Sequence, residues 1–292
     1  MRIDLHAHTS RSDGTDSPVE LIQAASAAGL DVVALTDHDT FIGWDEARAE
    51  AERLRVGLIV GAEISCRFGH MGVHLLAYLP DPTDPTLQNE LERVREGRNA
   101  RVPLILERLA ALGVNLTLED VAAESVEATS LGRPHIADAL VARGYVASRK
   151  EAFDRWLAEG KPGYITRYAP DPESTIRFVI EAGGVPVLAH PWGRGSRSVL
   201  TPSVLADFAA LGLAGVEVDH HDHDPATREA LRSLTSSLGL IATGSSDYHG
   251  AGKTDHDLGS CTTSPEQFER LLEVAAKNSE ASDRSAATPY LP

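Results

Sequence analysis

The chain has 292 residues, of which 42% are hydrophobic and 24% charged, a composition typical of one large folded domain or two modest ones. Its formal net charge of −16 argues against binding to long DNA or RNA, and its two cysteines exclude a disulfide scaffold and a cysteine-rich metal site. It shows no apolar run near ~18 residues and no secretory signal, so we expect a cytoplasmic protein without membrane contact.

Short β-branched segments alternate with amphipathic segments in both flanks of the chain. The predicted strands are Arg2–His6, Asp31–Thr36, Gly57–Ile64, Val73–Leu79, Val185–Ala189, Gly215–Val218 and Leu240–Thr243. Helix starts are indicated at Ser17, Asp224 and Ser264, each an N-cap residue followed by proline. The alternation predicts an α/β fold with parallel strands and helical crossovers. Seven strands favour a TIM-like barrel, although an open doubly wound sheet also fits the pattern.

The middle of the chain differs from both flanks. Residues 87–167 hold 12 Lys/Arg and 12 Asp/Glu, so the whole net charge lies outside them. This part shows helix patterns and no strand pattern. We therefore predict a barrel in two parts, 1–98 and 166–277, and an all-helical insertion over 99–165 that covers the substrate. Residues 278–292 are polar and lack periodicity, so we expect a flexible tail.

Side chains that can bind metal gather where the predicted strands end. His6 and His8 share one face of the first strand, and Asp13 follows in the next loop. Later strand ends carry His38, Glu63, His190, Asp247 and His249. In β/α barrels, this end of the strands carries the active site. His74 is the exception, because it lies near the start of its strand.

These nine side chains suit divalent cations. Imidazole and carboxylate groups together bind zinc, manganese or iron, and nine donors are enough for two or three ions. Two ions ~3.5–4 Å apart can stabilise both the attacking and the leaving oxygen of a phosphoryl displacement. Each motif alone has an ordinary explanation, such as a surface H-x-H or a turn after a strand. Five strand ends that all carry such residues favour a metal centre.

The motifs HAHTSRSDG, LTDHDT, GAEIS, VHLLAYL, LAHP and GSSDYHG resemble those of the PHP (polymerase and histidinol phosphatase) superfamily. The resemblance covers both flanks of the chain and implies a distorted seven-stranded β/α barrel. In the middle, SLGRPHIADALVARG and GKPGYI resemble a branch of small bacterial phosphoesterases that act on nucleotides. That branch includes nucleoside 3′,5′-bisphosphate phosphatases and a 5′-to-3′ exoribonuclease that acts on short RNA.

The resemblance also implies three groups of metal ligands. They are His6, His8, Glu63 and Asp247 for a first ion; Glu63, His74 and His190 for a second; and Asp13, His38 and His249 for a third. Many PHP proteins have histidine in place of Asp13, so the third site here is richer in oxygen and suits manganese or iron as well as zinc. We expect Asp37 to orient an imidazole rather than bind metal.

Residues that bind the substrate phosphate are expected in the helical part and in one barrel loop. Arg133 and His135 begin a predicted helix, and a helix N-terminus with a guanidinium forms a phosphate site. An ion pair between Arg133 and a barrel carboxylate is the alternative. In catalysis we expect Arg133 to position the phosphate and His135 to protonate the leaving alkoxide. Arg194 and Arg197 are candidates for a second phosphate.

Two further groups of histidines are less informative. The run His220–His223 follows a predicted strand and fits either a metal contact or a polar loop. His256 lies in a polar segment and is expected to be solvated.

Together these features predict a metal-dependent phosphatase or phosphoesterase that hydrolyses a nucleotide by metal-activated hydroxide. The preferred substrate is the 3′-phosphate of a nucleoside 3′,5′-bisphosphate. The alternatives are a 5′-to-3′ exoribonuclease on short RNA, a histidinol-phosphate-type phosphatase, and a PHP module without catalysis. Proteins that follow a long polyanion usually offer a basic groove, and the cations here form only two small groups.

Overall fold

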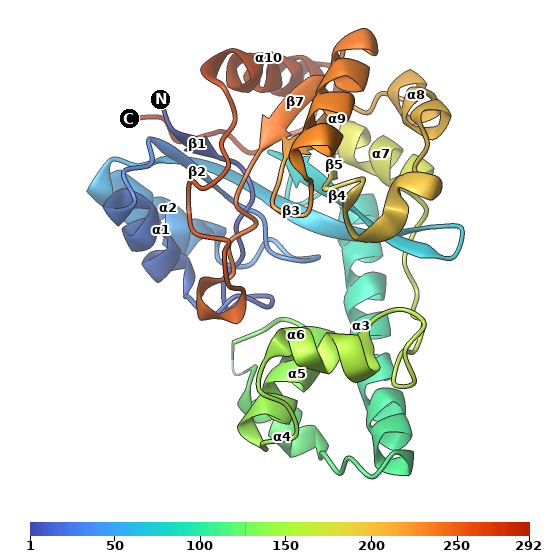
Figure 1. Ribbon diagram of the computed structural model, residues 1–292. Coiled ribbons are helices and arrows are strands. Elements are labelled where there is room, and N and C mark those ends of the chain that lie inside the picture. Colours follow the sequence, from blue (N-terminus) through green and yellow to red (C-terminus); the bar gives the residue numbers. More distant parts are fainter. Residues whose placement is uncertain (126) are drawn as a thin grey trace.

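The computed structural model describes residues 1–125 and 127–292, and for Arg194 it describes the backbone alone (Figure 1). Seven strands form one sheet whose spatial order follows the chain. They are β1 (Ile3–Asp4), β2 (Val32–Leu35), β3 (Gly57–Phe68), β4 (Met71–Tyr78), β5 (Val185–Ala189), β6 (Gly215–Asp219) and β7 (Ile241–Gly244). All seven predicted strands are confirmed, although β1 is shorter and β3 longer than predicted.

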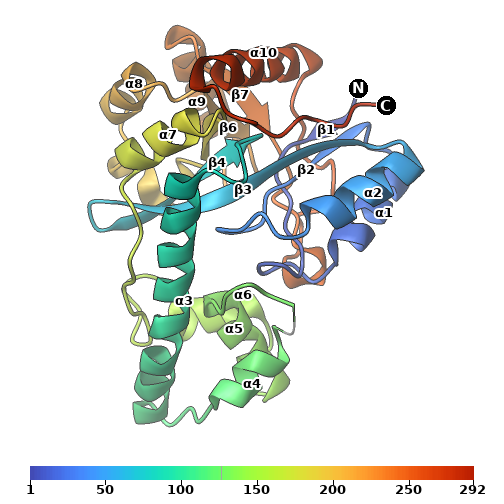
Figure 2. The ribbon, with the colours of Figure 1, turned by 180° about the vertical axis from the view of Figure 1, so that it is seen from behind.

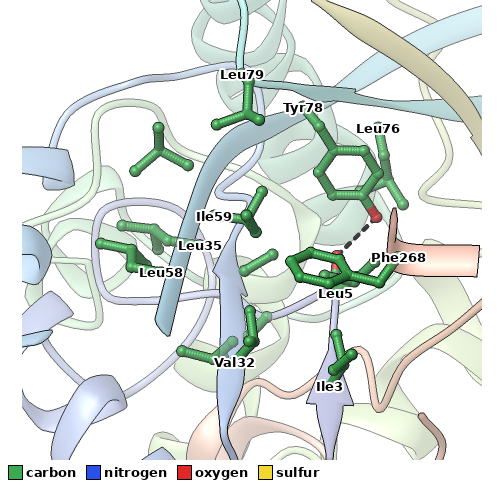
Figure 3. Close-up of a cluster of buried hydrophobic side chains, with 14 of the residues drawn as sticks. Ile3, Leu5, Val32, Leu35, Leu58, Ile59, Leu76, Tyr78, Leu79 and Phe268 are labelled. Atoms are coloured by element: carbon green, nitrogen blue, oxygen red, sulfur yellow. Dashed lines mark hydrogen bonds between the residues drawn. The ribbon is translucent and has the colours of Figure 1, made fainter. Parts of the chain in front are cut away.

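The sheet curves until its two edges nearly meet. Ala7 pairs with Tyr248, and the N–H of Thr263 donates to the carbonyl of Ile3 at 2.9 Å. Inside the buried hydrophobic cluster, the Tyr78 hydroxyl donates to the carbonyl of Leu5 at 2.7 Å and so joins β4 to the end of β1 (Figure 3). These contacts confirm the barrel and exclude the open doubly wound sheet.

One strand runs against the others. β4 is antiparallel to both β3 and β5, whereas the remaining neighbours are parallel. The prediction of parallel strands throughout is therefore wrong for β4. The reason is the connection between β3 and β4, Gly69–His70, which is long enough for a hairpin and too short for a helical crossover. As a result, β4 begins at the barrel edge where the parallel strands end.

Helices pack around the barrel (Figures 1 and 2). They are α1 (Pro18–Ala27), α2 (Trp44–Leu54), α7 (Pro172–Glu181), α8 (Pro202–Ala210), α9 (Pro225–Ser237) and α10 (Pro265–Ser282), with short 3-10 helices η2 (Gly193–Ser198) and η3 (Gly250–Gly252). The predicted helix starts are confirmed, because Ser17, Asp224 and Ser264 each accept a backbone N–H of the first turn. Within the described ranges, no helix combines the length and apolar character needed to cross a membrane.

The remaining helices lie between β4 and β5. They are α3 (Pro85–Ala111), α4 (Leu118–Ala123), α5 (Arg133–Ala142) and α6 (Arg149–Ala152), which continues into the π-helical turn η1 (Phe153–Leu157). The first half of α3 packs on the barrel through Leu87 and Leu91, and its second half packs on α4–α6 through Val102 and Ile105 (Figure 1). The predicted boundary at residues 98 and 99 falls inside this continuous helix, so the division into barrel and insertion stays a prediction.

The C-terminal segment has more structure than the sequence suggested. α10 continues to Ser282, and Tyr290 exchanges two backbone hydrogen bonds with Leu58, of 2.8 and 3.0 Å. Regular structure therefore extends past residue 278, and the flexibility of residues 278–292 stays a prediction. The pairing of Tyr290 is possible because β4 pairs with β3 only from Gly61 onward and leaves the backbone groups of Leu58 for Tyr290.

Candidate metal centre

The nine predicted metal ligands come together at the barrel edge where the parallel strands end. Seven of them follow strands, namely His6, His8, Asp13, His38, His190, Asp247 and His249. Glu63 lies inside β3, because this strand continues past the barrel edge to pair with β4. His74 lies early in β4 and reaches the same edge because β4 runs in the opposite direction.

The carboxylate of Glu63 lies between two groups of imidazoles. Its Oε1 is 2.7 Å from Nδ1 of His74 and 3.0 Å from Nε2 of His190. Its Oε2 is 3.1 Å from Nδ1 of His38 and 3.2 Å from Nε2 of His8. The side chain is almost fully buried. Because its two oxygens face separate donor groups, this carboxylate would contribute an oxygen to each of two cation sites.

Asp13 joins the imidazoles on one side of this cluster. Its Oδ1 is 3.4 Å from Nε2 of His249, and its Oδ2 is 3.6 Å from Nε2 of His38. The carboxylate is buried, and it also lies 3.7 Å from Nδ1 of His8. Asp13 therefore brings oxygen donors to a group that is otherwise made of imidazoles.

Several donor atoms converge in a way that suits a cation better than a hydrogen bond. Nε2 of His6 and Nε2 of His8 are 3.0 Å apart, and both lie within 3.6 Å of Oδ1 of Asp247. Nδ1 of His74 is buried and, among the described residues, has no hydrogen-bond partner, although Oε1 of Glu63 is near. All nine side chains fall into groups of three whose donor atoms lie within 4.8 Å of one another. This set of converging nitrogen and oxygen donors fits divalent cations.

The charges of the cluster depend on one another. Burial disfavours the imidazolium form of His8, yet hydrogen bonds with Asp247 and Glu63 raise its pKa to about 9. Burial also disfavours the carboxylate of Glu63, but neighbouring imidazoles, His74 first, hold its pKa well below the usual range. For His38, burial prevails and lowers the pKa to about 3. The carboxylates stay ionised and attract positive charge, which protons or divalent cations can supply.

A buried carboxylate that the sequence did not single out supports two of the imidazoles. Oε1 of Glu217, in β6, is 3.2 Å from Nδ1 of His6. Oε2 of Glu217 accepts the backbone N–H of His190 at 2.8 Å. Glu217 therefore orients His6 and holds the chain at His190. The available signal was an acidic residue inside the apolar run GVEV.

The histidines of the run His220–His223 differ in their surroundings: one contacts a predicted metal ligand, and the other two belong to a polar loop. Nε2 of His220 donates to Oδ2 of Asp247 at 3.2 Å, because its Nδ1 accepts the N–H of Asp222 at 3.0 Å. His221 and His223 bind groups outside the cluster, the hydroxyl of Ser260 and the carbonyl of Val218. His220 thus positions a predicted metal ligand, and its neighbours belong to the loop.

His256 differs from its prediction. It is partly buried, and it lies with His220 and Asp247 in a group of donors within 4.8 Å. Its Nε2 is buried and has no hydrogen-bond partner in the described part of the chain. The prediction of a solvated side chain is wrong because the ring of His256 packs on those of His221 and His220, with ring centres 4.7 and 6.0 Å apart.

Asp37 orients the loop after β1 more directly than it orients an imidazole. It accepts the N–H of Thr9 at 2.8 Å and the hydroxyl of Ser12 at 2.5 Å. The Ser12 hydroxyl lies 3.4 Å from Nδ1 of His8, so Asp37 influences that imidazole through Ser12.

His135 is fixed by backbone groups at both ring nitrogens. Its Nδ1 accepts the N–H of Gly132 at 3.0 Å, and its Nε2 donates to the carbonyl of Ser12 at 2.8 Å. The side chain is buried, and burial lowers its pKa. A ring with both nitrogens engaged in this way does not support the predicted role as proton donor to a leaving group.

The three predicted arginines have different surroundings. Arg133 donates to the carbonyl of Leu157 at 3.0 Å, and its guanidinium lies 5.3 Å from the ring centre of Tyr164. Arg197 is exposed and stacks on Trp192 at 4.5 Å. The side chain of Arg194 lies outside the described residues.

A β/α barrel whose strand ends gather these imidazoles and carboxylates defines a metal-dependent hydrolase. Comparison with known proteins gives the family. The PHP domain family matches residues 4–113. A 3′,5′-nucleoside bisphosphate phosphatase of Chromobacterium violaceum is 33% identical over 257 residues, which cover 88% of this chain and 90% of that protein. A 5′-3′ exoribonuclease of Haemophilus influenzae is 31% identical over 248 residues, which cover 85% and 90%.

A solved structure agrees with these relatives. A candidate metal-dependent phosphoesterase from Bifidobacterium adolescentis superposes with a TM-score of 0.88 and 36% identity, over 93% of this chain and 96% of that chain. The chain therefore belongs to the PHP family, and it is a metal-dependent phosphoesterase.

Proposed function

We propose that this enzyme removes the 3′-phosphate of nucleoside 3′,5′-bisphosphates with two or three divalent cations, of manganese, zinc or iron. The observation that carries the proposal is the position of Glu63, whose two oxygens face separate groups of imidazoles. The Chromobacterium violaceum relative, whose name gives this substrate, supports the choice.

The metal ligands are assigned in three groups. They are His6, His8, Glu63 and Asp247; Glu63, His74 and His190; and Asp13, His38 and His249. The second group, and His6, His8 and Asp247 of the first, have donor atoms within 4.8 Å of one another. His8 lies near Asp13 as well as Asp247, which supports a compact arrangement of the first and third groups. Divalent cations in such a cluster supply positive charge for the phosphate oxygens and lower the pKa of the attacking water.

A group of arginines beside the cluster supports a second phosphate on the substrate. The group consists of Arg98, Arg101, Arg133 and Arg167. Burial first, and then the neighbouring guanidiniums, lower the pKa of Arg101 to about 8 and that of Arg167 to about 9. Arg101 is buried, and its Nε has no hydrogen-bond partner within the described residues. A buried guanidinium with an unsatisfied nitrogen, placed among other guanidiniums, favours an anionic ligand.

The arginine group lies close enough to the metal ligands for a single substrate molecule with two phosphates to reach both. Nη2 of Arg98 donates to the hydroxyl of Ser65 at 2.7 Å, and Ser65 stands directly opposite His74 in the sheet. Ser65 is two residues from Glu63 on the same strand, a separation of about 7 Å. One phosphate therefore reaches the arginines while another lies over the metal ligands.

Arg133 joins this group from the first turn of α5, and we assign it to the non-reacting phosphate. His135, in the same turn, holds α5 on the barrel through Ser12 and acts by position rather than by proton transfer. In this proposal the helices between β4 and β5, over residues 99–165, cover the substrate.

The proposal is tested by comparing kcat/KM for four substrates with manganese at two salt concentrations. They are a nucleoside 3′,5′-bisphosphate, a nucleoside 3′-monophosphate, histidinol phosphate, and an oligoribonucleotide longer than about five nucleotides. We expect the bisphosphate to be the best substrate and its salt dependence to be shallow, because few phosphates are neutralised. Faster release of mononucleotides from the oligonucleotide, with a steep salt dependence, would replace this proposal by the exoribonuclease. No turnover of any of the four substrates would overturn the proposed substrate.

A further inference from the structure

The loop that carries Asp13 is bound by the helices between β4 and β5. Three successive backbone carbonyls of this loop each accept a hydrogen bond from that part of the chain. The bonds run from the N–H of Thr129 to Arg11 at 3.0 Å, from Nε2 of His135 to Ser12 at 2.8 Å, and from Nη1 of Arg149 to Asp13 at 3.1 Å. The backbone on either side of the Asp13 carboxylate is therefore held from outside the barrel.

Arg149 also lies against a second loop that carries a predicted ligand. Its guanidinium pairs with Asp138 on α5, with Nη2 2.5 Å from Oδ2. A Cβ atom at Gly252 would overlap this guanidinium, so Arg149 packs directly on the backbone there. The N–H of Gly252 donates to the carbonyl of His249 at 3.2 Å. One side chain thus contacts the loops of both Asp13 and His249.

Asp13 and His249 are neighbours within the metal centre. Oδ1 of Asp13 lies 3.4 Å from Nε2 of His249, and both residues form one group of donors with His8. Fixing their two loops in one position prepares these donors for a cation, because less conformational freedom is lost on binding. Arg149 binds neither ligand side chain, so it acts through the backbone of both loops.

We propose that Arg149 and His135 are positioning residues for one metal ion, so that docking of α5 and α6 on the barrel sets the occupancy of its site. The inference rests on the proposed function, which takes Asp13 and His249 as ligands of the same ion. His135 and Arg133 share the first turn of α5, so phosphate binding by Arg133 and metal binding by Asp13 are coupled through this helix.

The test measures metal binding without substrate. The metal-free protein is dialysed against a series of free manganese concentrations, and bound manganese is counted by mass spectrometry. The variants are Arg149→Met, Arg149→Lys, His135→Phe and Asp13→Asn. Arg143→Met is the matched control, because Arg143 pairs with Asp120 at 3.1 Å within the helices and away from the barrel loops. Thermal unfolding of each metal-free variant checks that it folds.

We expect Arg149→Met and His135→Phe to lower the affinity for one manganese ion by about tenfold or more and to leave the affinity for the other ions unchanged. Asp13→Asn should affect the same ion, Arg149→Lys should restore part of the affinity, and Arg143→Met should match the wild type. If Asp13→Asn loses an ion while Arg149→Met and His135→Phe bind all ions normally, the positioning role is overturned and the ligand assignment stands. If Asp13→Asn also binds all ions normally, the ligand assignment fails, and the positioning role fails with it.

Discussion

Nδ1 of His74 on β4 lies 2.7 Å from Oε1 of Glu63 on β3, although these two residues are not directly opposite each other in the sheet. The register pairs His74 with Ser65, so His74 meets Glu63 as a diagonal neighbour on the same face. The antiparallel direction of β4 places His74, from the start of a strand, at the edge where the parallel strands end. The β3–β4 hairpin therefore completes one of the two groups of imidazoles that Glu63 joins.

Glu217→Gln tests the residue that supports the metal centre from β6. The amide removes the negative charge beside Nδ1 of His6, which is 3.2 Å away in the wild type. We expect the manganese affinity to fall by about 10–100-fold and kcat to fall with it. Equilibrium dialysis and steady-state kinetics measure the two effects. Glu229→Gln, an exposed change on α9, is the control, and equal affinity in both variants would contradict the assigned role.

Arg101→Met tests the arginine group as a phosphate site. We expect kcat/KM for a nucleoside 3′,5′-bisphosphate to fall, because the loss of a charge-assisted hydrogen bond removes about 1.5–3 kcal/mol of transition-state stabilisation. Hydrolysis of an aryl phosphate should be unchanged. The thermal midpoint of the free protein should not fall, because burial and repulsion by neighbouring guanidiniums already disfavour this charge. Arg177→Met, an exposed change on α7, is the control. Equal losses on both substrates would remove Arg101 from the site of the second phosphate.

Asp39→Asn tests the buried ion pair that joins α3 to the barrel. Asp39 accepts from Nε of Arg98 and from the N–H of Ser65, both at 2.7 Å. Asparagine tolerates the positive φ of this position, so the change mainly leaves Arg98 unpaired, at a cost of about 3–5 kcal/mol in the free energy of unfolding. Urea unfolding with a chelator at neutral pH measures this loss. Asp283→Asn, at an exposed position that also has positive φ, is the control.

The same variant gives a pH dependence with a defined sign. Burial opposes the carboxylate of Asp39, but the charge of Arg98 lowers its pKa from 3.8 to about 2. The contribution of a carboxylate with a depressed pKa is complete above its unfolded pKa and is lost as the pH falls through its folded pKa. The difference in unfolding free energy between wild type and Asp39→Asn should therefore be constant above pH 4 and shrink towards pH 2. A constant difference over this interval would contradict the assigned charge state.

Local patterns account for most of what the sequence predicted correctly. Strands and helix starts depend on hydrophobic alternation and on caps such as Ser17, which act within a few residues. The gathering of His6, Glu63 and Asp247 followed from one topological rule, that functional residues follow strand ends in a β/α barrel. Their role as metal ligands stays a prediction that the variants above test.

The relationships that the sequence did not predict depend on contacts between distant segments. Glu217 looked like a polar residue in a strand until the barrel placed it beside His6, 211 positions away in the chain. Arg101 and Arg167 come together only when α3 packs against the segment before α7. The hydrogen bonds of His135 likewise depend on where α5 meets the loop after β1.

The most direct test of the account compares the wild type with Glu63→Gln for metal content and for release of phosphate from a nucleoside 3′,5′-bisphosphate. Glu52→Gln, an exposed change on α2, is the control. The account predicts that the wild type releases only the 3′-phosphate, that a chelator abolishes this release, and that Glu63→Gln folds but loses bound metal and nearly all turnover. The reason is that a neutral amide does not bridge two cations as a carboxylate does. Unchanged metal stoichiometry and unchanged turnover in Glu63→Gln would contradict the account.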